Sequence, residues 1–307
     1  MSDRIPWQAG NLWPRLKAQR QHGLRMGALQ PAETVVEYVE SGGVRFVVRV
    51  LTNLSQKEAA GQKARQFQAE TASGKTVSGK TAPVNPFLPY EKDLYVTDIS
   101  ETHLCLLNKF NVVDHHFLIV TRQYEPQENW LTLTDFEALV RCLQEVDGVA
   151  FFNGGTVAGS SQPHKHLQVV PYTSEPDTRS MEAAITAAQL KSGSEGVRES
   201  PVFPFMHVIT LTGSEAIAQQ QLDRYHTLLN AVGIVSDQWQ GLQTAAYNLL
   251  CTREWMMIVP RRQEKYANIS VNSLGFVGSL LVKDEAMLEQ LREIGPMTLL
   301  KQVGFSR

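Results

Sequence analysis

Cysteine is scarce in this chain, and long apolar runs are missing from it. The 307 residues include three cysteines, Cys105, Cys142 and Cys251, which stand far apart. So few scattered thiols exclude a disulfide framework and a four-cysteine zinc site, and they favour a reducing compartment. No stretch approaches the ~18 consecutive apolar residues of a membrane span, and residues 1–25 lack the apolar core of a signal peptide. These absences predict a cytoplasmic protein that does not enter a membrane.

An excess of charge of either sign is missing as well. Lysine and arginine number 29 against 31 aspartates and glutamates, so the formal net charge is −2. A general nucleic-acid binder needs a basic field, and this balance argues against one. A small nucleotide ligand stays open, because one pocket needs only a few cations. Hydrophobic residues make up 43% of the chain, an ordinary value for one large globular domain or two of about 150 residues.

Short apolar runs and amphipathic stretches predict a mixture of strands and helices. Strands are expected at 44–51, 103–107, 116–121, 149–152, 164–170, 206–211, 244–252 and 255–260. Helices are expected at 16–26, between 134 and 148, at about 180–191, between 214 and 233, and at 284–294. Thr134 is the expected N-cap of the second helix, with Glu137 as its capping-box partner. Residues 1–40 are otherwise expected to be a polar lead-in, and residues 55–82 a surface loop.

A segment that contains glycine and proline, residues 173–201, suggests a division of the chain into two parts. We expect a first domain over 1–178 and a second over 179–307. A weak similarity of 104–108 with 116–122 to 247–251 with 255–261 suggests two related halves.

The strongest chemical signal is a polar stripe on the strand expected at 164–170. Alternate residues of a strand face the same side, so His164, His166 and Gln168 share one face. A hydrated sheet surface or a pair of core histidines is one interpretation. A metal site is a second, although this stretch lacks a carboxylate or thiolate ligand. The third is nucleophilic catalysis, in which a neutral imidazole attacks phosphorus and forms a phosphoramidate.

The residues before this stripe favour the third interpretation. Asn153-Gly154-Gly155 and Gly159-Ser160-Ser161 form an approach rich in glycine and hydroxyl groups. Such backbone can come close to an anion, and its N–H groups can hold a phosphate. A glycine-rich turn alone is a weak signal, but one that leads directly into His-x-His-x-Gln is much stronger.

At this point the sequence resembles the histidine-triad superfamily, and more narrowly its transferase branch. The resemblance rests on Asn153-x-Gly155-x-x-x-Gly159-x-Ser161-Gln162-Pro163-His164-x-His166-x-Gln168. That branch contains galactose-1-phosphate uridylyltransferases and diadenosine tetraphosphate phosphorylases, which are also called ATP adenylyltransferases. Further stretches resemble the phosphorylases: 85–90, 107–110, 116–122, 271–278 and 281–283. The resemblance covers roughly residues 40–300 and implies an α+β fold, with an antiparallel sheet of histidine-triad type and a smaller C-terminal half that completes the nucleotide site.

The resemblance also implies a mechanism. His166 would attack the α-phosphate of a dinucleoside polyphosphate, ATP would leave, and AMP would stay on His166 until phosphate releases it as ADP. The step would be reversible, and His164 would orient the nucleophile or its phosphate. Ser160, Ser161 and Gln162 would line the polyphosphate path. The phosphate cradle would be shaped by Asn153, Gly155 and Gly159, and the polyphosphate charge compensated by Lys57 and Lys283.

Gln168 bears on the choice between transfer and hydrolysis. Hydrolases of the superfamily carry a third histidine at this place, whereas an amide has no titrating proton to donate. That difference favours phosphate over water as the acceptor. A sugar-1-phosphate nucleotidylyltransferase, a dinucleoside polyphosphate hydrolase and a non-catalytic nucleotide-binding protein stay open as alternatives. The expected partners are diadenosine tetraphosphate, ATP, ADP and phosphate, with no resident cofactor and magnesium open as a companion of the polyphosphate.

Other candidate motifs have simpler interpretations. Gly74 to Thr81 fits the phosphate-loop pattern G-x-x-x-x-G-K-T, but no apolar strand precedes it and no helix follows it. We therefore expect a surface loop there. His115 and His116 are expected to have a structural or loop role, and the isolated histidines His22, His103, His207 and His226 to be structural. Arg261 and Arg262 are expected in a solvated turn.

Overall fold

One ten-stranded antiparallel sheet runs through the protein, whose computed structural model describes residues 4–52, 87–172, 179–193, 196–213 and 217–307. Its strands follow one another in space as β3 (Tyr95–Asp98), β4 (His103–Leu107), β5 (Phe117–Thr121), β7 (His166–Pro171), β6 (Gly148–Asn153), β11 (Tyr247–Cys251), β12 (Trp255–Pro260), β10 (Val208–Leu211), β9 (Arg198–Glu199) and β8 (Gln189–Leu190). The central strands are buried on both faces, which explains their nearly continuous apolar sequences. The expected α+β fold with a large antiparallel sheet is confirmed.

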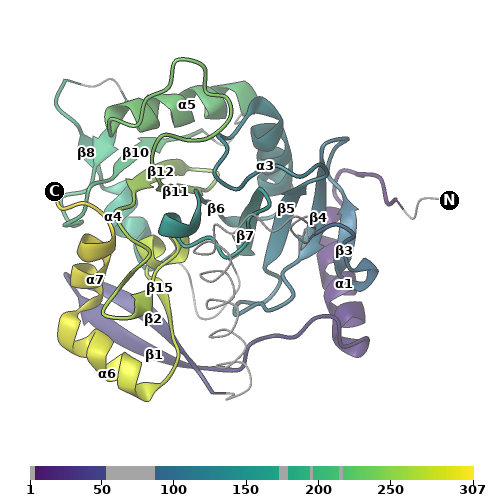
Figure 1. Cartoon of the computed structure of the whole chain (residues 1–307), viewed down its shortest axis with the longest axis horizontal. Helices are drawn as coiled ribbons and strands as arrows, with labels where there is room; N and C mark the ends of the chain where they lie inside the picture. Colours follow the sequence, from purple (N-terminus) through teal and green to yellow (C-terminus); the bar gives the residue numbers. More distant parts are fainter. Residues whose placement is uncertain (1–3, 53–86, 173–178, 194–195, 214–216) are drawn as a thin grey trace, which may run out of the picture.

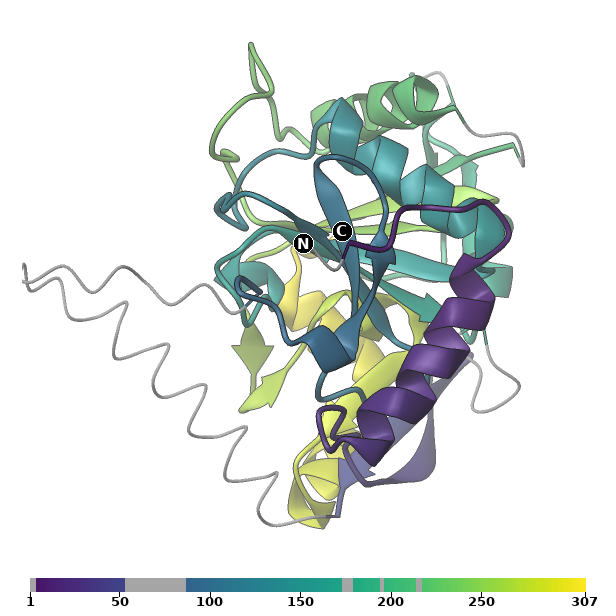
Figure 2. The same cartoon turned by 90° about the vertical axis from the view of Figure 1, so that its right-hand side faces the viewer.

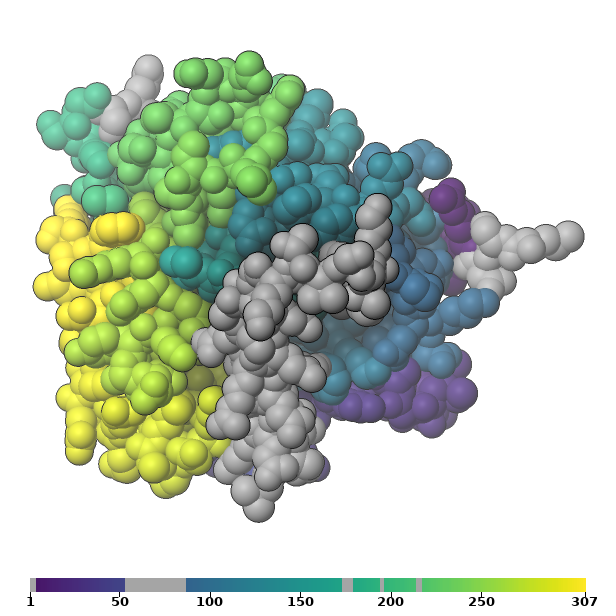
Figure 3. Space-filling model, in the orientation of Figure 1, coloured from purple at the N-terminus to yellow at the C-terminus, as the bar shows by residue number. Residues whose placement is uncertain are grey.

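Different layers cover the two faces of this sheet (Figures 1 and 2). One face packs against helices α1 (Leu12–Arg25), α3 (Leu133–Glu145) and α5 (Ala218–Ala231). The other face packs against a small sheet of β1 (Thr34–Ser41), β2 (Val44–Leu51) and β15 (Ser279–Val282), together with α6 (Glu285–Ile294) and α7 (Pro296–Val303). In the space-filling view, the yellow residues of α6 and α7 lie together along one edge of the molecule (Figure 3).

Short elements complete the described chain. They are α4 (Glu182–Thr186), the hairpin of β13 (Lys265–Tyr266) and β14 (Ile269–Ser270), and the 3-10 turns η1 (Lys92–Leu94), η2 (Thr156–Ala158) and η3 (Ser273–Val277). None of the helices in the described ranges is long and apolar enough to cross a membrane.

The large sheet is built from two repeats of one topology. The first runs β3-β4-β5-α3-β6-β7 along the chain, and the second runs β8-β9-β10-α5-β11-β12. Their strand orders mirror each other across the antiparallel pairing of β6 with β11. The expected similarity between halves therefore exists, but the expected correspondence was wrong. The counterpart of the hairpin β11-β12 is β6-β7, and not the hairpin β4-β5.

The repeat places Trp255 where the first repeat has His166. Each begins a six-residue strand that ends on proline, and the strands pair with β6 and β11 through Gly148 opposite Pro171 and Tyr247 opposite Pro260. Trp255 is fully buried in the apolar cluster beneath the small sheet. The second repeat thus has the same strand arrangement, but a buried apolar side chain, that of Trp255, occupies the position equivalent to His166.

The helices and strands expected from the sequence agree best with the observed ones where an apolar run is buried. The differences have local causes. β1 lies in the expected lead-in, and an apolar-run criterion did not detect it because Val39 is the one buried residue among its eight. α3 begins two residues early, with Thr132 as N-cap and Asp135 as the capping-box partner instead of Thr134 and Glu137. The helix expected at 180–191 is only α4. The glycine-lysine motif at 74–81, the loop expected at 55–82 and Ser214, the expected cap of the helix between 214 and 233, lie outside the described residues.

The expected domain division near residue 178 stays a prediction. The large sheet crosses it, because β6 of the first part pairs with β11 of the second from Asn153 opposite Asn248 to Ala150 opposite Cys251.

Candidate active site

The histidine stripe lies at the start of β7, in the middle of the first repeat. His166 and Gln168 point to the face that carries the small sheet, whereas Leu167 and Val169 join the helix-covered core. His164 precedes the strand and forms a backbone bridge with Pro126. The alternation expected from the sequence therefore places the polar side chains on one face.

His166 is held in a single tautomer. Its Nδ1 lies 2.8 Å from the carbonyl oxygen of His164. A carbonyl oxygen can only accept, so Nδ1 carries the proton and Nε2 keeps its lone pair. The side chain is 4% exposed, and burial lowers the pKa of His166 to about 4. The ring is therefore neutral near pH 7, and its Nε2 lone pair is free of a proton.

This pKa predicts an acid-sensitive site. We expect the His166 ring to titrate with a midpoint near pH 4 in an NMR titration, because burial disfavours the charged imidazolium. The folded pKa lies below the unfolded value of about 6.5, so the stability contributed by the neutral ring is complete above pH 6.5 and is lost as the pH falls through about 4. The His166→Asn variant should lose less stability than the wild type over that interval. A His166 midpoint near 6.5 would contradict the buried neutral ring.

His164 fixes the orientation of the His166 ring through its main-chain carbonyl group. Its own ring is buried, and its Nε2 lies 2.8 Å from the hydroxyl oxygen of Thr121. That hydroxyl donates to the carbonyl oxygen of Gln123 at 2.9 Å, so it accepts from the imidazole. The rings of Phe87 and Tyr124 pack against His164 with centroids 5.5 Å away. The His164 carbonyl group, whose oxygen accepts the hydrogen bond from His166 Nδ1, is thereby fixed in place.

Gln127 forms a side-chain bridge that the sequence did not indicate. Strands β6 and β7 are paired as far as Phe151 and Gln168. Beyond that point the Gln127 amide lies between them: its Nε2 donates to the carbonyl oxygens of Asn153 at 2.9 Å and His166 at 3.2 Å, and its Oε1 accepts from the His166 N–H at 2.9 Å. The amide replaces a peptide group, separates the two strands and fixes the backbone of His166.

Replacing this amide tests its importance. We expect Gln127→Glu to lower the free energy of unfolding by about 3 kcal/mol, because a buried carboxylate oxygen would face the carbonyl oxygens of Asn153 and His166 where an N–H group now donates to both. Urea unfolding measures the change. The matched control is Gln123→Glu, at an exposed position of the same loop, which should change stability little. Equal small effects at both positions would show that the bridge contributes nothing.

The opposite side of β7 is anchored by buried charges. Lys165 is 1% exposed, and its Nζ lies 2.7 Å from Asp135 Oδ2 and 3.1 Å from Glu125 Oε2. Asp135 also contacts Nε2 of His103 at 3.0 Å. Burial alone would raise the pKa of Asp135, but the bond from His103 and the charge of Lys165 hold it at about 2. This cluster confirms a structural role for His103 and secures the strand behind His166.

Two glycines allow the turn that leads to the stripe. Gly155 and Gly159 have φ angles of 85° and 90°, a region that favours glycine. A Cβ on Gly159 would lie 2.7 Å from the carbonyl oxygen of Val271, and one on Gly155 would lie 3.0 Å from Glu128 Cγ. These glycines are therefore required by conformation and by close packing, before any ligand is considered.

Asn153 and Arg261 anchor this turn from within the protein. The Asn153 side-chain oxygen accepts from Asn248 Nδ2 at 2.9 Å and from the Ser273 hydroxyl at 2.7 Å. Arg261 donates to the carbonyl oxygen of Ala158 at 3.1 Å and to Asn248 Oδ1 at 2.7 Å. Burial lowers the pKa of Arg261 to about 9, so it stays charged near neutral pH. The expectation of a solvated turn was wrong for Arg261, which is 3% exposed, whereas Arg262 is exposed.

Most N–H groups of the turn are already used. Those of Gly154, Gly155, Ala158, Gly159 and Ser160 donate to carbonyl oxygens of the protein. The Ser160 hydroxyl is likewise bonded, to the carbonyl oxygen of Gln162 at 3.0 Å. Across the described part of the chain, the N–H groups of Ser161 and Gln162 have no protein acceptor. These two groups, next to the stripe, are the donors that the turn can offer to an anion.

The two lysines chosen from the sequence are not joined to the stripe. Lys57 lies outside the described residues. Lys283 is exposed just after β15, and it forms no ion pair with any residue of the described ranges. Its side chain is thus not held in place by the protein.

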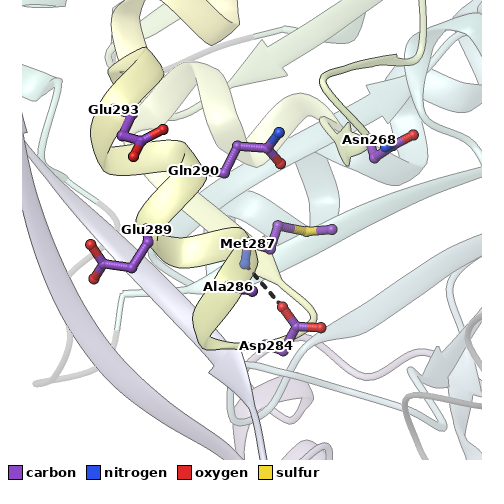
Figure 4. Close-up of a pocket in the computed structure, with 7 residues that line it drawn as sticks. All are labelled: Asn268, Asp284, Ala286, Met287, Glu289, Gln290 and Glu293. Atoms are coloured by element: carbon purple, nitrogen blue, oxygen red, sulfur yellow. Dashed lines mark hydrogen bonds between the residues drawn. The ribbon is translucent and has the colours of Figure 1, made fainter.

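A surface hollow beside α6 has the wrong charge for an anion. Figure 4 shows Asp284, Glu289 and Glu293 around it, with Asn268 of the β13–β14 turn at its edge. Asp284 is the N-cap of α6 and accepts from the Met287 N–H at 2.9 Å. No three histidine, cysteine, aspartate or glutamate side chains within the described ranges, these included, are grouped to hold a metal ion.

Gln168 has an unexpected neighbour in His116. The imidazole Nε2 lies 3.0 Å from Gln168 Oε1. His116 is 7% exposed and directly precedes β5, which pairs with β7 through Leu118 opposite Gln168. This contact joins His116 to the histidine stripe, and the structural or loop role expected for it stays a prediction. The two residues are 52 positions apart, and no local pattern indicated their contact.

Models of known families match the chain in two parts. The model described as the Ap4A phosphorylase N-terminal domain matches residues 2–188, and the model described as the ATP adenylyltransferase C-terminal domain matches residues 201–306. Diadenosine 5',5'''-P1,P4-tetraphosphate phosphorylase 2 of Saccharomyces cerevisiae is 29% identical over 233 residues, which are 68% of this chain and 72% of the relative. Protein APA1 of the same organism is 27% identical over 210 residues, which are 63% of this chain and 65% of the relative.

Solved structures share the fold. The crystal structure of yeast Ap4A phosphorylase Apa2 superposes with a TM-score of 0.77 at 22% identity, covering 96% of this chain and 95% of that chain. The structure of Apa2 in complex with Ap4A gives the same TM-score and identity, with 96% and 98% covered.

Proposed function

The chain belongs to the Ap4A phosphorylase family, and we propose that it converts diadenosine tetraphosphate (Ap4A) and phosphate reversibly into ATP and ADP. The observation that carries this proposal is the fixed tautomer of His166, whose Nδ1 proton is held by the His164 carbonyl oxygen at 2.8 Å while Nε2 keeps its lone pair. A neutral imidazole in this state is suited to nucleotidyl transfer through a covalent intermediate.

The first step forms an adenylyl-enzyme. Nε2 of His166 attacks the α-phosphorus of Ap4A, a P–N bond forms, and the bond from that phosphorus to the oxygen bridging to the β-phosphate breaks. ATP leaves with that oxygen, and the adenylyl group stays on His166. The ring gains positive charge in this step, and the His164 carbonyl dipole stabilises the Nδ1–H that bears part of it.

The second step transfers the adenylyl group to phosphate. A phosphate oxygen attacks the same phosphorus, the P–N bond breaks, and ADP forms. Charge on the non-bridging oxygens is stabilised by the N–H groups of Ser161 and Gln162 and by the amide of Gln168. Lys57 and Lys283 compensate the charge of the polyphosphate.

This chemistry needs no resident cofactor. A magnesium ion, if one takes part, binds together with the polyphosphate. We propose a cytoplasmic location, which the few scattered cysteines support because they favour a reducing compartment. The partners are small nucleotides and phosphate.

Product analysis with labelled phosphate tests the proposal. With Ap4A and radiolabelled phosphate, we expect equal amounts of ATP and ADP, with the label in the β-phosphate of ADP. AMP and ATP formed without phosphate would instead indicate a hydrolase. Binding of Ap4A without any product would indicate a nucleotide-binding protein, and turnover of nucleotide sugars alone would indicate the uridylyltransferase branch.

A further inference from the structure

The two ends of the Gln168 side-chain amide have opposite effects on a phosphoryl group. Its Nε2 donates hydrogen bonds, whereas its Oε1 only accepts them. An acceptor turned toward a phosphoryl oxygen would repel it. The amide can rotate by half a turn at little steric cost, so the site needs a feature that selects one orientation. The contact of Gln168 with His116 supplies a candidate.

A chain of hydrogen bonds connects Gln168 to the main chain through His116. Gln168 Oε1 lies 3.0 Å from His116 Nε2, and His116 Nδ1 lies 3.2 Å from Asn108 Nδ2. The Phe110 N–H donates to Asn108 Oδ1 at 3.3 Å. The backbone between these groups is held too, because the Asn108 N–H donates to the His116 carbonyl oxygen at 3.0 Å.

The backbone N–H of Phe110 sets the direction of the whole chain. A main-chain N–H cannot exchange places with an acceptor, so Asn108 must turn its oxygen toward it. The Asn108 NH2 then faces His116 Nδ1, which must accept. Because burial lowers the pKa of His116 to about 4, the ring is neutral and its one proton lies on Nε2. Gln168 Oε1 accepts that proton, and Gln168 Nε2 is left to face away from His116.

We propose that His116 is a positioning residue that turns the NH2 group of Gln168, rather than its oxygen, toward the phosphoryl group carried by His166. This inference rests on the proposed function, because it assigns the amide a target. It explains how a buried histidine outside the recognised motif takes part in the site. It also gives two neighbouring histidines opposite tautomers, with the proton of His166 on Nδ1 and that of His116 on Nε2.

Nitrogen NMR of the free protein tests the tautomers without any substrate. With 15N-labelled histidine at pH 7, we expect His116 to be neutral and protonated on Nε2, and His166 to be neutral and protonated on Nδ1. The His116→Gln and His166→Asn variants assign the signals. A His116 ring protonated on Nδ1 would overturn the proposal, because Gln168 would then present its oxygen to the substrate.

A double-mutant cycle tests whether His116 acts through Gln168. We expect His116→Phe to slow single-turnover adenylylation on the order of tenfold to a hundredfold, less than the ~10²–10³-fold typical of losing a donor outright. In a Gln168→Leu background the same change should slow it by less than about twofold. His116→Gln, which keeps a donor at the Nε2 position, should restore most of the rate.

The matched control is His115→Asn, which removes a ring that packs on Trp13 with centroids 5.0 Å apart. Asparagine suits the positive φ angle at position 115, so the backbone there is kept. The variant should leave the rate unchanged. Additive losses from His116→Phe and Gln168→Leu would overturn the proposal and indicate a general structural role. A wild-type protein that forms no adenylyl-enzyme would refute the proposed function instead, and the tautomers would still report on the hydrogen-bond chain.

Discussion

His166→Ala abolishes the adenylyl-enzyme and lowers the rate of phosphorolysis by at least about 10⁴-fold, while the protein stays folded. Removing a covalent nucleophile typically has an effect of this size or larger, because the remaining groups can only bind the substrate. No other described side chain on this face offers a neutral imidazole with its Nε2 lone pair available. His116 Nε2 carries a proton that Gln168 accepts, and His164 Nε2 is bonded to Thr121. Quenched-flow measurement of ATP release in the first turnover reports the loss.

The control separates the nucleophile from its structural setting. His166→Asn keeps an N–H in reach of the His164 carbonyl oxygen and so preserves the bond that Nδ1 makes at 2.8 Å. We expect this variant to unfold at nearly the wild-type urea concentration and to be as inactive as His166→Ala. Activity within tenfold of wild type in either variant would contradict the assignment of His166.

Arg261→Met destabilises the protein by about 4 kcal/mol. The guanidinium donates to the carbonyl oxygens of Ala158, Val303, Gln263 and Glu264 and to the side chain of Asn248. Each buried acceptor that loses its donor lowers the free energy of unfolding by about 1–3 kcal/mol, and the loss is smaller where a water molecule can replace the donor. Ala158 lies in the glycine turn, so the variant should also raise the KM for Ap4A. Urea unfolding and steady-state kinetics measure both effects.

Arg262→Met is the matched control, since it removes the same charge from the adjacent, exposed position. It should change stability by less than about 0.5 kcal/mol. If both variants were equally stable, the buried network around Arg261 would not support the turn in the way described.

The sequence predicted the parts of the site whose signals are local. His166 and Gln168 alternate along one short strand, and the glycines that precede them stand within fifteen residues. The buried strand runs, such as Phe117–Thr121, were equally visible. β1 was missed because Val39 is the one buried residue among its eight, and the shift in the start of α3 arose because Thr132 and Thr134 are both possible caps.

The remaining features depend on contacts between distant parts of the chain. Gln127 lies 39 positions from His166, His116 lies 52 from Gln168, and Ser273 lies 120 from Asn153. His116 and Ser273 lie in stretches that resemble the phosphorylases, 116–122 and 271–278, but nothing in the sequence indicated which distant residues these side chains, or that of Gln127, would contact. The mirrored strand order that pairs β6-β7 with β11-β12 was also hidden, because Trp255 and Met257 replace the polar residues of the first repeat. Tertiary structure was needed to recognise them.

Trapping the intermediate tests the central claim most directly. The protein is mixed with Ap4A in phosphate-free buffer, quenched at alkaline pH, at which phosphoramidates persist, and analysed by mass spectrometry before and after digestion. We predict the release of one ATP for each adenylyl group gained, with that group on the peptide that contains His166, and its conversion to ADP when phosphate is added before the quench. Multiple turnovers to AMP and ATP with no adenylyl-enzyme, or an adenylyl group on another residue, would contradict the account.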